Sequence, residues 1–326
     1  MMLPAALDRM RGLHVIVVGD LLLDRILAGQ PTRLSREAPI PVLEETRRAE
    51  HPGGGSAPAL TLIGLGARVD LVGVVGDDDE GARLQALLLE HGADIDGVSV
   101  DRARRTSVKT RIVAEGLLVY PQQVARLDRV DRTPLTTVIE RALVTTIHRL
   151  ARGRIDALLV SDYQCGVATP DVIAAVRAAG QGRLTVADAQ TDPARFAGFD
   201  LIRCNEAEAE RALGGPVTAE IVAAGREQLG CRMLAVTRGA DAAYLAHPGG
   251  LETVPAANRT DVYDVTGAGD AVVAVMTAAL ATGTTPRDAL LLAQLAGGIA
   301  VRAWGNVPVT AAQLTLALEQ MDDRAR

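Results

Sequence analysis

The sequence predicts a doubly wound α/β fold, in which helices flank both faces of a mostly parallel sheet. Short apolar runs alternate with longer helical stretches along the 326 residues. Runs such as "ALLVSDY" (157–163) are apolar almost throughout, which is typical of parallel strands buried on both faces. No fixed-period repeat or low-complexity linker divides the chain. We therefore expect one main domain over residues 1–326.

The boundaries of the individual elements follow from the apolar runs and the turn residues between them. We predict strands at 13–18, 69–75, 155–160, 183–187, 200–203 and 232–237. We predict helices at 55–66, 79–91, 134–151, 169–180, 205–213, 218–229, 269–282, 286–303 and 310–320. Segments 25–50 and 106–126 alternate apolar and polar residues in short pieces. They suggest a small β lid outside the main sheet, with an exposed loop and a hairpin as the simpler alternative.

Composition excludes several classes of protein. A hydrophobic fraction of 48% argues against disorder, and a net charge of −6 argues against a nucleic-acid partner. Residues 271–281, the longest apolar helix candidate, fall short of the roughly 20 residues a bilayer requires, so we expect no membrane partner. Cys165, Cys204 and Cys231 lack CxxC spacing and are interpreted as reduced thiols of a cytoplasmic protein.

The segment "DVTGAGDA" (264–271) is the strongest indication of chemistry. Gly267, Ala268 and Gly269 leave the backbone almost bare where an apolar helix begins, so their N–H groups can cradle an anion. Asp270 beside that cradle could accept a proton from an attacking hydroxyl during phosphoryl transfer. The alternative is an ordinary helix start in which Asp270 only complements the helix dipole. No GxxxxGK[ST] motif is present, so the P-loop plan is excluded.

Together with other segments, these residues resemble the ribokinase-like (PfkB) carbohydrate kinases, and the resemblance covers essentially the whole chain. The matching segments are "VVGDLLLD" (17–24), "PGGGSAPALTLIGLGA" (52–67), "VGVVGDDDEGARL" (72–84), "CNEAEAE" (204–210) and "VTRG" (236–239). Within that family the likeness is greatest to the D-glycero-β-D-manno-heptose 7-phosphate kinases. It rests on "SREAPIPV" (35–42), "KTR" (109–111), "RLD" (126–128), "SDY" (161–163) and "VYDVTGAGD" (262–270).

The resemblance implies roles for the glycine segment and its surroundings. Asp270 would be the catalytic base, and the amides of Gly267, Ala268 and Gly269 the anion hole. Asp264 would belong to a monovalent cation site, such as one for K⁺, behind that hole. The carbonyls of Thr266, Ala300 and Gly305 are its possible partners.

The resemblance also implies a nucleotide side of the site. Asn205 and Glu208 match the family's NxxE pair, and Glu208 would organise Mg²⁺ near the phosphates of ATP. Thr237 and Gly239 lie where the family binds nucleotide. The alternative for Asn205 and Glu208 is a capping box at a helix start.

On the sugar side, the resemblance implies that Asp20 and Asp24 accept sugar hydroxyls and that Gly53 and Gly54 form the turn that the sugar approaches. Asp20 and Asp24 could instead cap the strand exit. Lys109, Arg111 and Arg126 could face a substrate phosphate or remain solvated. Lys109 is the only lysine in the sequence, which favours a functional role.

Three positions depart from the pattern of the heptose kinases and put the identity of the sugar in doubt. Ala57 stands where the family has a sugar-binding Asn, and Cys165 and Gln190 stand where those kinases have Lys. Losing a buried polar contact typically costs about 1–3 kcal/mol, so the preferred sugar should change. Those kinases are often fused to a nucleotidyltransferase domain. The sequence ends at Arg326, so we expect this chain to lack that second activity.

We therefore expect an ATP-dependent kinase that transfers the γ-phosphoryl group to a sugar hydroxyl. Heptose 7-phosphate or a related sugar phosphate is the expected acceptor. The alternatives are a kinase for another sugar or a nucleoside, and a catalytically weak sugar-binding or regulatory protein of the same fold. The resemblance also implies a homodimer formed through the lid.

Overall fold

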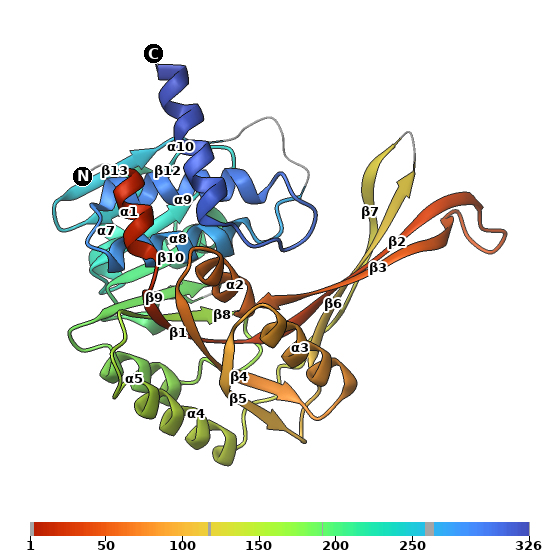
Figure 1. Cartoon of the computed structure of the whole chain (residues 1–326), viewed down its shortest axis with the longest axis horizontal. Helices are drawn as coiled ribbons and strands as arrows, with labels where there is room; N and C mark the ends of the chain where they lie inside the picture. Colours follow the sequence, from red (N-terminus) through yellow and green to blue (C-terminus); the bar gives the residue numbers. More distant parts are fainter. Residues whose placement is uncertain (1–2, 117–118, 191, 258–263, 326) are drawn as a thin grey trace.

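The computed structural model describes residues 3–116, 119–190, 192–257 and 264–325. It contains a nine-stranded sheet covered by helices and a separate four-stranded sheet that projects from the body as an arm (Figure 1). In space the large sheet runs β13-β12-β11-β10-β9-β8-β1-β4-β5. Its strands are β1 (His14–Gly19), β4 (Arg68–Gly76), β5 (Asp94–Asp101), β8 (Ala157–Asp162), β9 (Leu184–Ala189), β10 (Leu201–Asn205), β11 (Met233–Thr237), β12 (Ala243–His247) and β13 (Gly250–Val254).

The first seven of these strands in chain order are parallel, whereas β12 and β13 run antiparallel at one edge. The chain moves outward from β1 through β4 to β5, then returns to the other side of β1 with β8. This reversal between β1 and β8 is the topological switch point. Ligands of such sheets bind there, beyond the carboxyl ends of the strands.

Helices cover both faces of the large sheet, and a short 3₁₀ turn follows β9. The helices are α1 (Leu3–Met10), α2 (Ser56–Gly64), α3 (Asp79–Glu90), α4 (Thr137–Leu150), α5 (Pro170–Ala179), α6 (Glu206–Leu213), α7 (Ala219–Gln228), α8 (Ala268–Ala281), α9 (Pro286–Ala300) and α10 (Ala311–Ala325); the 3₁₀ turn is Pro193–Phe196. None of these helices, in the part of the chain that the structure describes, is long and apolar enough to cross a bilayer.

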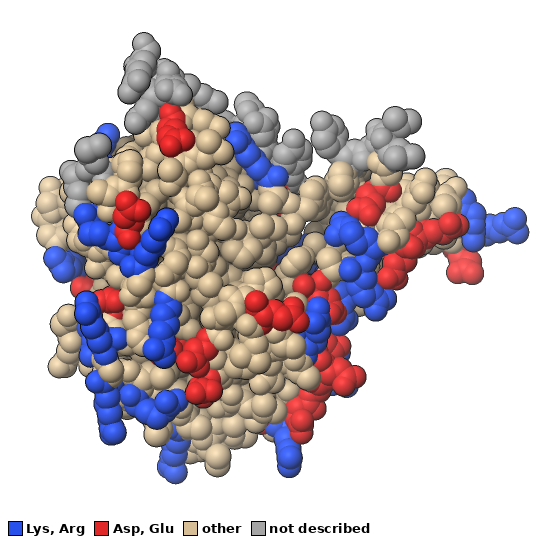
Figure 2. All heavy atoms as spheres, in the orientation of Figure 1, with Lys and Arg blue, Asp and Glu red and all other residues tan. Residues whose placement is uncertain are grey.

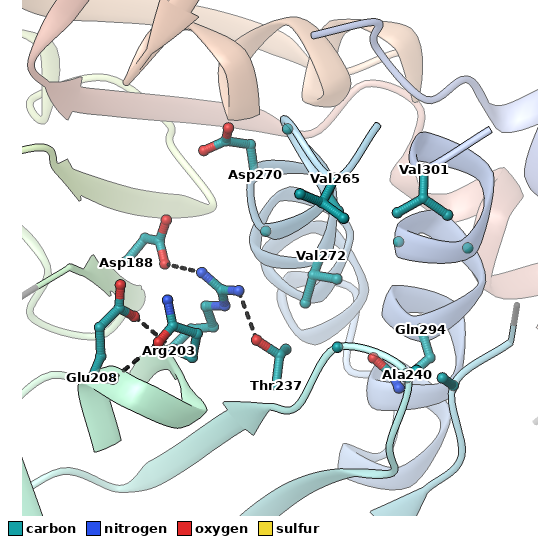
Figure 3. Close-up of a pocket in the computed structure, with 18 of the residues that line it drawn as sticks. Asp188, Arg203, Glu208, Thr237, Ala240, Val265, Asp270, Val272, Gln294 and Val301 are labelled. Atoms are coloured by element: carbon teal, nitrogen blue, oxygen red, sulfur yellow. Dashed lines mark hydrogen bonds and ion pairs between the residues drawn. The ribbon is translucent and has the colours of Figure 1, made fainter. Parts of the chain in front are cut away.

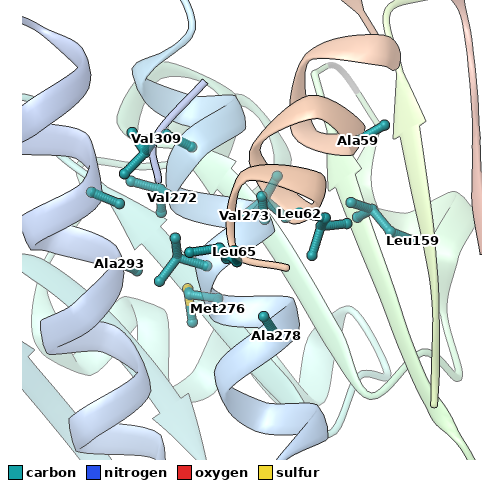
Figure 4. Packing of buried hydrophobic residues seen from close by; sticks show 14 of the residues in the cluster. Ala59, Leu62, Leu65, Leu159, Val272, Val273, Met276, Ala278, Ala293 and Val309 are labelled. Atoms are coloured by element: carbon teal, nitrogen blue, oxygen red, sulfur yellow. The ribbon is translucent and has the colours of Figure 1, made fainter. Parts of the chain in front are cut away.

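The core has two halves, one on each face of the large sheet. In β1, Val15 and Val17 pack with α1, α2, α8 and α9, whereas Ile16 and Val18 pack with α4 and α5. This alternation is the period-two geometry of a strand buried on both sides. In the first half, Leu62 and Leu65 of the α2 region meet Val273 and Met276 of α8 (Figure 4).

Helix α8 is the most deeply buried of these elements. All of its residues from Asp270 to Ala279 are buried, and burying one large apolar side chain stabilises the fold by about 1.5–3 kcal/mol. Its N-terminus is thus fixed at the carboxyl edge of the sheet, which is where the glycine segment lies.

The projecting arm is the four-stranded sheet, in the order β3-β2-β6-β7. Its strands are β2 (Leu21–Leu34), β3 (Pro41–Gly54), β6 (Ser107–Gly116) and β7 (Val119–Arg129). The β2–β3 and β6–β7 pairs are antiparallel, and β2 and β6 are parallel. Residues 117 and 118 of the predicted lid segment lie outside the described residues. The predicted small β lid is confirmed as this sheet.

Ion pairs between the arm and α3 hold the base of the arm. Arg83 of α3 pairs with Glu50 of β3 at 3.3 Å, and Arg129 of β7 pairs with Glu80 of α3 at 3.0 Å. On the face shown in Figure 2, acidic and basic side chains are interspersed along the arm and the body.

The fold class is confirmed, and every predicted main-sheet strand and helix is present within a few residues. The sequence did not predict α1, β5, β12 or β13. Strands β5 and β13 form the two edges of the sheet and β12 lies beside β13. Each of the three is only partly buried, so their sequences lack a fully buried apolar run. In β13, for example, only Val254 is buried.

Candidate active site

A cavity of about 520 Å³ opens at the carboxyl edge of the large sheet, against the N-terminus of α8 (Figure 3). The ends of β9, β10 and β11 form one wall, and the start of α8 with part of α9 forms the other. Its charged lining residues are Asp188, Arg203, Glu208 and Asp270. The cavity therefore brings strand ends and a helix N-terminus together at the place expected for a phosphorylated ligand.

The glycine segment forms the start of α8 as predicted. Gly267 is the N-cap residue with φ +77°, a left-handed conformation that suits glycine. A Cβ on Gly269 would lie 2.8 Å from Nη1 of Arg203, so only glycine lets the backbone approach that side chain. The N–H groups of Gly267 and Gly269 have no protein acceptor among the described residues, and that of Ala268 makes one long bond, 3.3 Å, to the Val265 carbonyl. The cradle is thus open toward the cavity.

Asp270 lies in the first turn of α8, with its side chain buried in the cavity wall. The hydroxyl of Tyr163 donates to both carboxylate oxygens, at 2.8 Å to Oδ1 and 3.0 Å to Oδ2. Burial raises the pKa of Asp270 to about 7, and nearby Asp188 adds to the rise, whereas Tyr163 and Arg203 oppose it. A carboxyl group with a pKa near neutrality is suited to accept a proton at physiological pH.

Arg203 is a buried cation at the centre of the cavity wall, and the sequence analysis did not identify it. It extends from β10, donates from Nη1 to Asp188 at 2.9 Å and from Nη2 to Thr237 at 2.7 Å, and packs against Gly269. Its Nε has no partner among the described residues. The sequence does carry a signal for Arg203, because it is a charged residue within the buried strand "LIRCN". Charged side chains are almost never fully buried unless they are paired, so an arginine at this position indicates a buried partner.

Asn205 and Glu208 form the capping box of α6. The Asn205 side chain accepts from the Glu208 amide at 2.9 Å, and the Glu208 carboxylate accepts from the Asn205 amide at 2.6 Å. Both residues also line the cavity, as do Thr237 and Gly239. Burial raises the pKa of Glu208. The capping box that the sequence analysis gave as the alternative is therefore present. The same two residues also line the cavity in which we expect the nucleotide.

The two aspartates of the predicted sugar side are both buried and already hydrogen-bonded. Asp20 accepts the backbone N–H groups of Tyr163, Cys165 and Val167, at 2.8, 3.0 and 2.9 Å. It thereby fixes the loop that carries Tyr163. Asp24 accepts from Nη1 of Arg111 at 2.8 Å.

Gly53 and Gly54 lie against these two aspartates. A Cβ on Gly53 would come within 2.3 Å of Oδ2 of Asp24, and Gly54 has φ +60° with its Cβ position 2.4 Å from the Asp20 carbonyl. Two glycines are thus required for β2 and β3 to meet here. The structure brings these four sugar-side residues into one group.

The arm carries the predicted phosphate contacts to the edge of the site. Nζ of Lys109 on β6 lies 4.6 Å from the centroid of the Tyr163 ring, and burial lowers the pKa of this lysine. Arg126 on β7 forms a bidentate pair with Asp128, at 2.8 and 2.7 Å. Lys109 makes no ion pair with any described residue, which leaves its ammonium group available to a ligand.

The residues predicted for a monovalent cation site lie behind the cradle. Asp264 accepts from the backbone N–H and hydroxyl of Thr266, at 2.9 and 2.7 Å, and from the Gly305 N–H at 3.0 Å. The Ala300 carbonyl accepts from the amide of Ala303 at 3.1 Å. Residues 262 and 263 of the "VYDVTGAGD" segment lie outside the described residues. Asp264 thus ties the turn before α8 to the loop after α9.

The three departing positions have different surroundings. Ala57 is buried in α2, and Gln190 lines the cavity beside Asp188. The Cys165 side chain is buried, which raises the pKa of its thiol to about 11 and keeps the thiol protonated. None of these groups supplies the positive charge of a lysine.

Together these features define a class of protein: an α/β enzyme with an anion cradle and an adjacent buried carboxyl group, the arrangement that phosphoryl transfer to a hydroxyl requires. The chain belongs to the pfkB family of carbohydrate kinases, because that family's model matches residues 13–309. It is therefore a phosphotransferase with an alcohol group as acceptor. Kinases of this family use ATP and Mg²⁺.

Individual relatives match over nearly the whole of this chain. The chain is 38% identical over 323 residues to "Bifunctional protein HldE" of Pelobacter propionicus, covering 95% of this chain and 64% of the relative. It is 37% identical over 324 residues to the protein of the same name from Paramagnetospirillum magneticum, covering 97% and 65%. The chain thus spans just under two thirds of the length of these relatives.

Among solved structures, a putative ribokinase from Agrobacterium tumefaciens superposes with a TM-score of 0.73 at 22% identity, covering 96% of this chain and 99% of that one. At this identity the likeness bears on the fold alone. It confirms the ribokinase-like architecture.

Proposed function

We propose that this kinase transfers the γ-phosphoryl group of ATP to a hydroxyl of D-glycero-β-D-manno-heptose 7-phosphate, with Asp270 as the catalytic base. One observation carries the proposal. The Asp270 carboxyl, whose pKa burial raises to about 7, lies beside the open amides of Gly267 and Gly269 in a cavity lined by Arg203.

The residues act in one displacement. Asp270 takes the proton of the acceptor hydroxyl, and the hydroxyl oxygen forms a bond to the γ-phosphorus as the bond to the β–γ bridging oxygen breaks. ADP leaves with that electron pair. The cradle amides and Arg203 face the oxygens of the migrating group and stabilise the charge on them.

We propose that Mg²⁺ is held by the phosphates and by Glu208 through water. The donor fits this plan, because the Glu208 carboxylate lines the cavity and carboxylate oxygens are the ligands that Mg²⁺ prefers. When bound, Mg²⁺ offsets phosphate charge. Glu208 uses one carboxylate oxygen for the α6 cap, and its orientation is therefore fixed.

We also propose a K⁺ requirement. Both Asp264 oxygens are engaged by protein donors, so Asp264 would act mainly by shaping the turn while the carbonyls of Thr266, Ala300 and Gly305 contact the ion. The expected effect of K⁺ is on the geometry of the cradle.

On the acceptor side, we propose that Lys109 and Arg126 of the arm contact the phosphate of the sugar and that Asp24 contacts its hydroxyls. The Lys109 ammonium, which forms no ion pair with the described residues and lies close to the ring of Tyr163, supports this assignment. The likeness to the heptose kinase segments and to the HldE proteins supports the choice of sugar.

We further propose that residues 1–326 form one kinase domain and that two copies associate through the arm. The place of action would be the cytoplasm, which supplies ATP and suits the three buried free cysteines.

A second acceptor is favoured by a specific observation. Gln190 lines the cavity without the charge expected there, and Ala57 offers no hydrogen bond to a sugar. Another sugar, or a nucleoside, is therefore the second candidate.

The test measures ADP release with Mg²⁺ and K⁺ against a panel of sugars, sugar phosphates and nucleosides, with Asp270→Asn as the control. Turnover on heptose 7-phosphate alone supports the proposal, and turnover on another acceptor selects the second candidate. Ligand binding without ADP release by the unmodified protein overturns the proposal and favours a sugar-binding or regulatory protein.

A further inference from the structure

The contact between Tyr163 and Asp270 is the feature of the cavity that the proposed reaction does not yet use. We propose that Tyr163 is a positioning residue: its hydroxyl fixes the orientation of the Asp270 carboxylate and stabilises the ionised form that accepts a proton. The inference rests on the proposed role of Asp270 as base. It concerns a residue that would act through Asp270, without itself taking the proton.

The backbone around Tyr163 is built to hold its side chain in place. Asp20 accepts the Tyr163 N–H at 2.8 Å, and Asp162 accepts the Gln164 N–H at 2.9 Å. Gln164 has φ +61° and is the one non-glycine residue with positive φ among the described residues. Such strain persists only where the surroundings enforce it. The sharp turn after β8 directs the tyrosine ring toward α8.

The ring itself is held from the side of the arm. Nζ of Lys109 lies 4.6 Å from its centroid, within the range of a cation–π interaction. A positive charge over the ring also makes the phenol a better hydrogen-bond donor. Tyr163 is therefore fixed by its backbone, by Lys109 and by Asp270 itself.

The charges around Asp270 explain why a neutral donor matters there. Asp188 from β9 and Asp24 from β2 oppose a negative charge on Asp270, and Arg203 from β10 favours it. Arg203 already donates to Asp188 and Thr237. Burial and the neighbouring carboxylates raise the pKa of Tyr163 well above its usual value, so the phenol stays protonated and donates throughout the neutral range. The Tyr163 hydroxyl is the group that hydrogen-bonds directly to both oxygens of the base.

The test is Tyr163→Phe, read as the pH dependence of kcat/KM, which reports on the free enzyme. Loss of the bond should move the acid limb up by about one pH unit, so that kcat/KM falls about fivefold at pH 7 and recovers by about pH 9. Saturating kinetics should show no rise in KM for ATP. A merely structural role would lower activity equally at every pH.

The chain contains a matched control in Tyr244. Its ring also has a cation over it, Arg238 at 5.2 Å, and its hydroxyl also has a hydrogen-bond partner, Arg238 Nη1 at 3.2 Å. It does not line the cavity. Tyr244→Phe should therefore leave the acid limb unchanged. Circular dichroism and melting curves of both variants establish that they are folded.

The outcomes separate this inference from the proposed function. If Asp270→Asn retains normal turnover, the base assignment fails and the inference fails with it. If Asp270→Asn is inactive and folded Tyr163→Phe keeps an unshifted acid limb, only the inference is overturned.

Discussion

Removing the charge of Arg203 should lower both the stability of the fold and the rate of catalysis. Arg203→Met keeps most of the apolar stem and leaves Asp188, which is 2% exposed, buried without its partner at 2.9 Å. Removing one member of a buried ion pair typically costs about 3–5 kcal/mol, since the other charge stays desolvated. For a chain of 326 residues this corresponds to a fall in melting temperature of about 4–7 °C.

The same change should reduce catalysis. Arg203 lowers the pKa of Asp270, so its removal raises that pKa and moves the acid limb of kcat/KM upward. Loss of a preorganised donor facing the phosphoryl group costs about 10²-fold in kcat. Calorimetry and steady-state ADP release measure the two effects separately. Asp188→Asn added to Arg203→Met should restore stability and leave kcat low.

Arg238→Met is the matched control, because Arg238 pairs with Glu206 at 2.8 Å in a position where both side chains are partly exposed. Such a pair is worth about 1 kcal/mol or less. If Arg203→Met melts within 1 °C of the unmodified chain and keeps its kcat, Arg203 is not the structural and electrostatic centre of this cavity and the reasoning is refuted.

Two further predictions concern α8. Asp270→Asn should reduce kcat by about 10²–10⁴-fold. Burial raises the folded-state pKa of Asp270 from 3.8 to about 7, so the folded state holds that proton more tightly and loses stability as pH rises between those values. The Asp270→Asn variant should therefore melt at a higher temperature than the unmodified chain at pH 8 and at the same temperature near pH 4. A difference in melting temperature that is constant across pH would contradict this. Gly267 has φ +77°, and a residue with a Cβ costs roughly 1–2 kcal/mol in that left-handed conformation. Gly267→Ala should destabilise the fold by more than this backbone cost, because the new Cβ would also lie 2.2 Å from Oδ1 of Asn306. Gly92→Ala, with φ +83° and open space around the Cβ, isolates the backbone cost, and equal urea midpoints for the two variants would contradict the role of Asn306.

The site residues that the sequence predicts are those whose functional partners lie next to them in the chain. Gly267 to Asp270 were identifiable because the bare backbone and the acid are adjacent in the chain, and the cradle's donors are backbone atoms. Asn205 and Glu208 likewise belong to a single helical turn. Continuous apolar runs made the central strands predictable for the same reason.

Arg203, Asp188 and Tyr163 could not be assigned in this way, because each acts through partners that are distant in sequence. Tyr163 meets Asp270 across 107 positions, and Arg203 meets Thr237 across 34. Asp188 and Tyr163 are polar residues near or just beyond the carboxyl end of a buried strand, and Arg203 is a charged residue within one. In a parallel sheet a position near the carboxyl end places side chains at a common edge, although it does not indicate which of them pair.

The solitary lysine of this chain has a practical consequence. Apart from the α-amino terminus, Lys109 offers the one primary amine in the sequence, and burial lowers its pKa. Acylation of Lys109 would remove its charge beside Tyr163. Because acceptor bound at the site would cover this amine, protection of Lys109 from acylation, followed by peptide mass analysis, would report acceptor occupancy without an engineered cysteine.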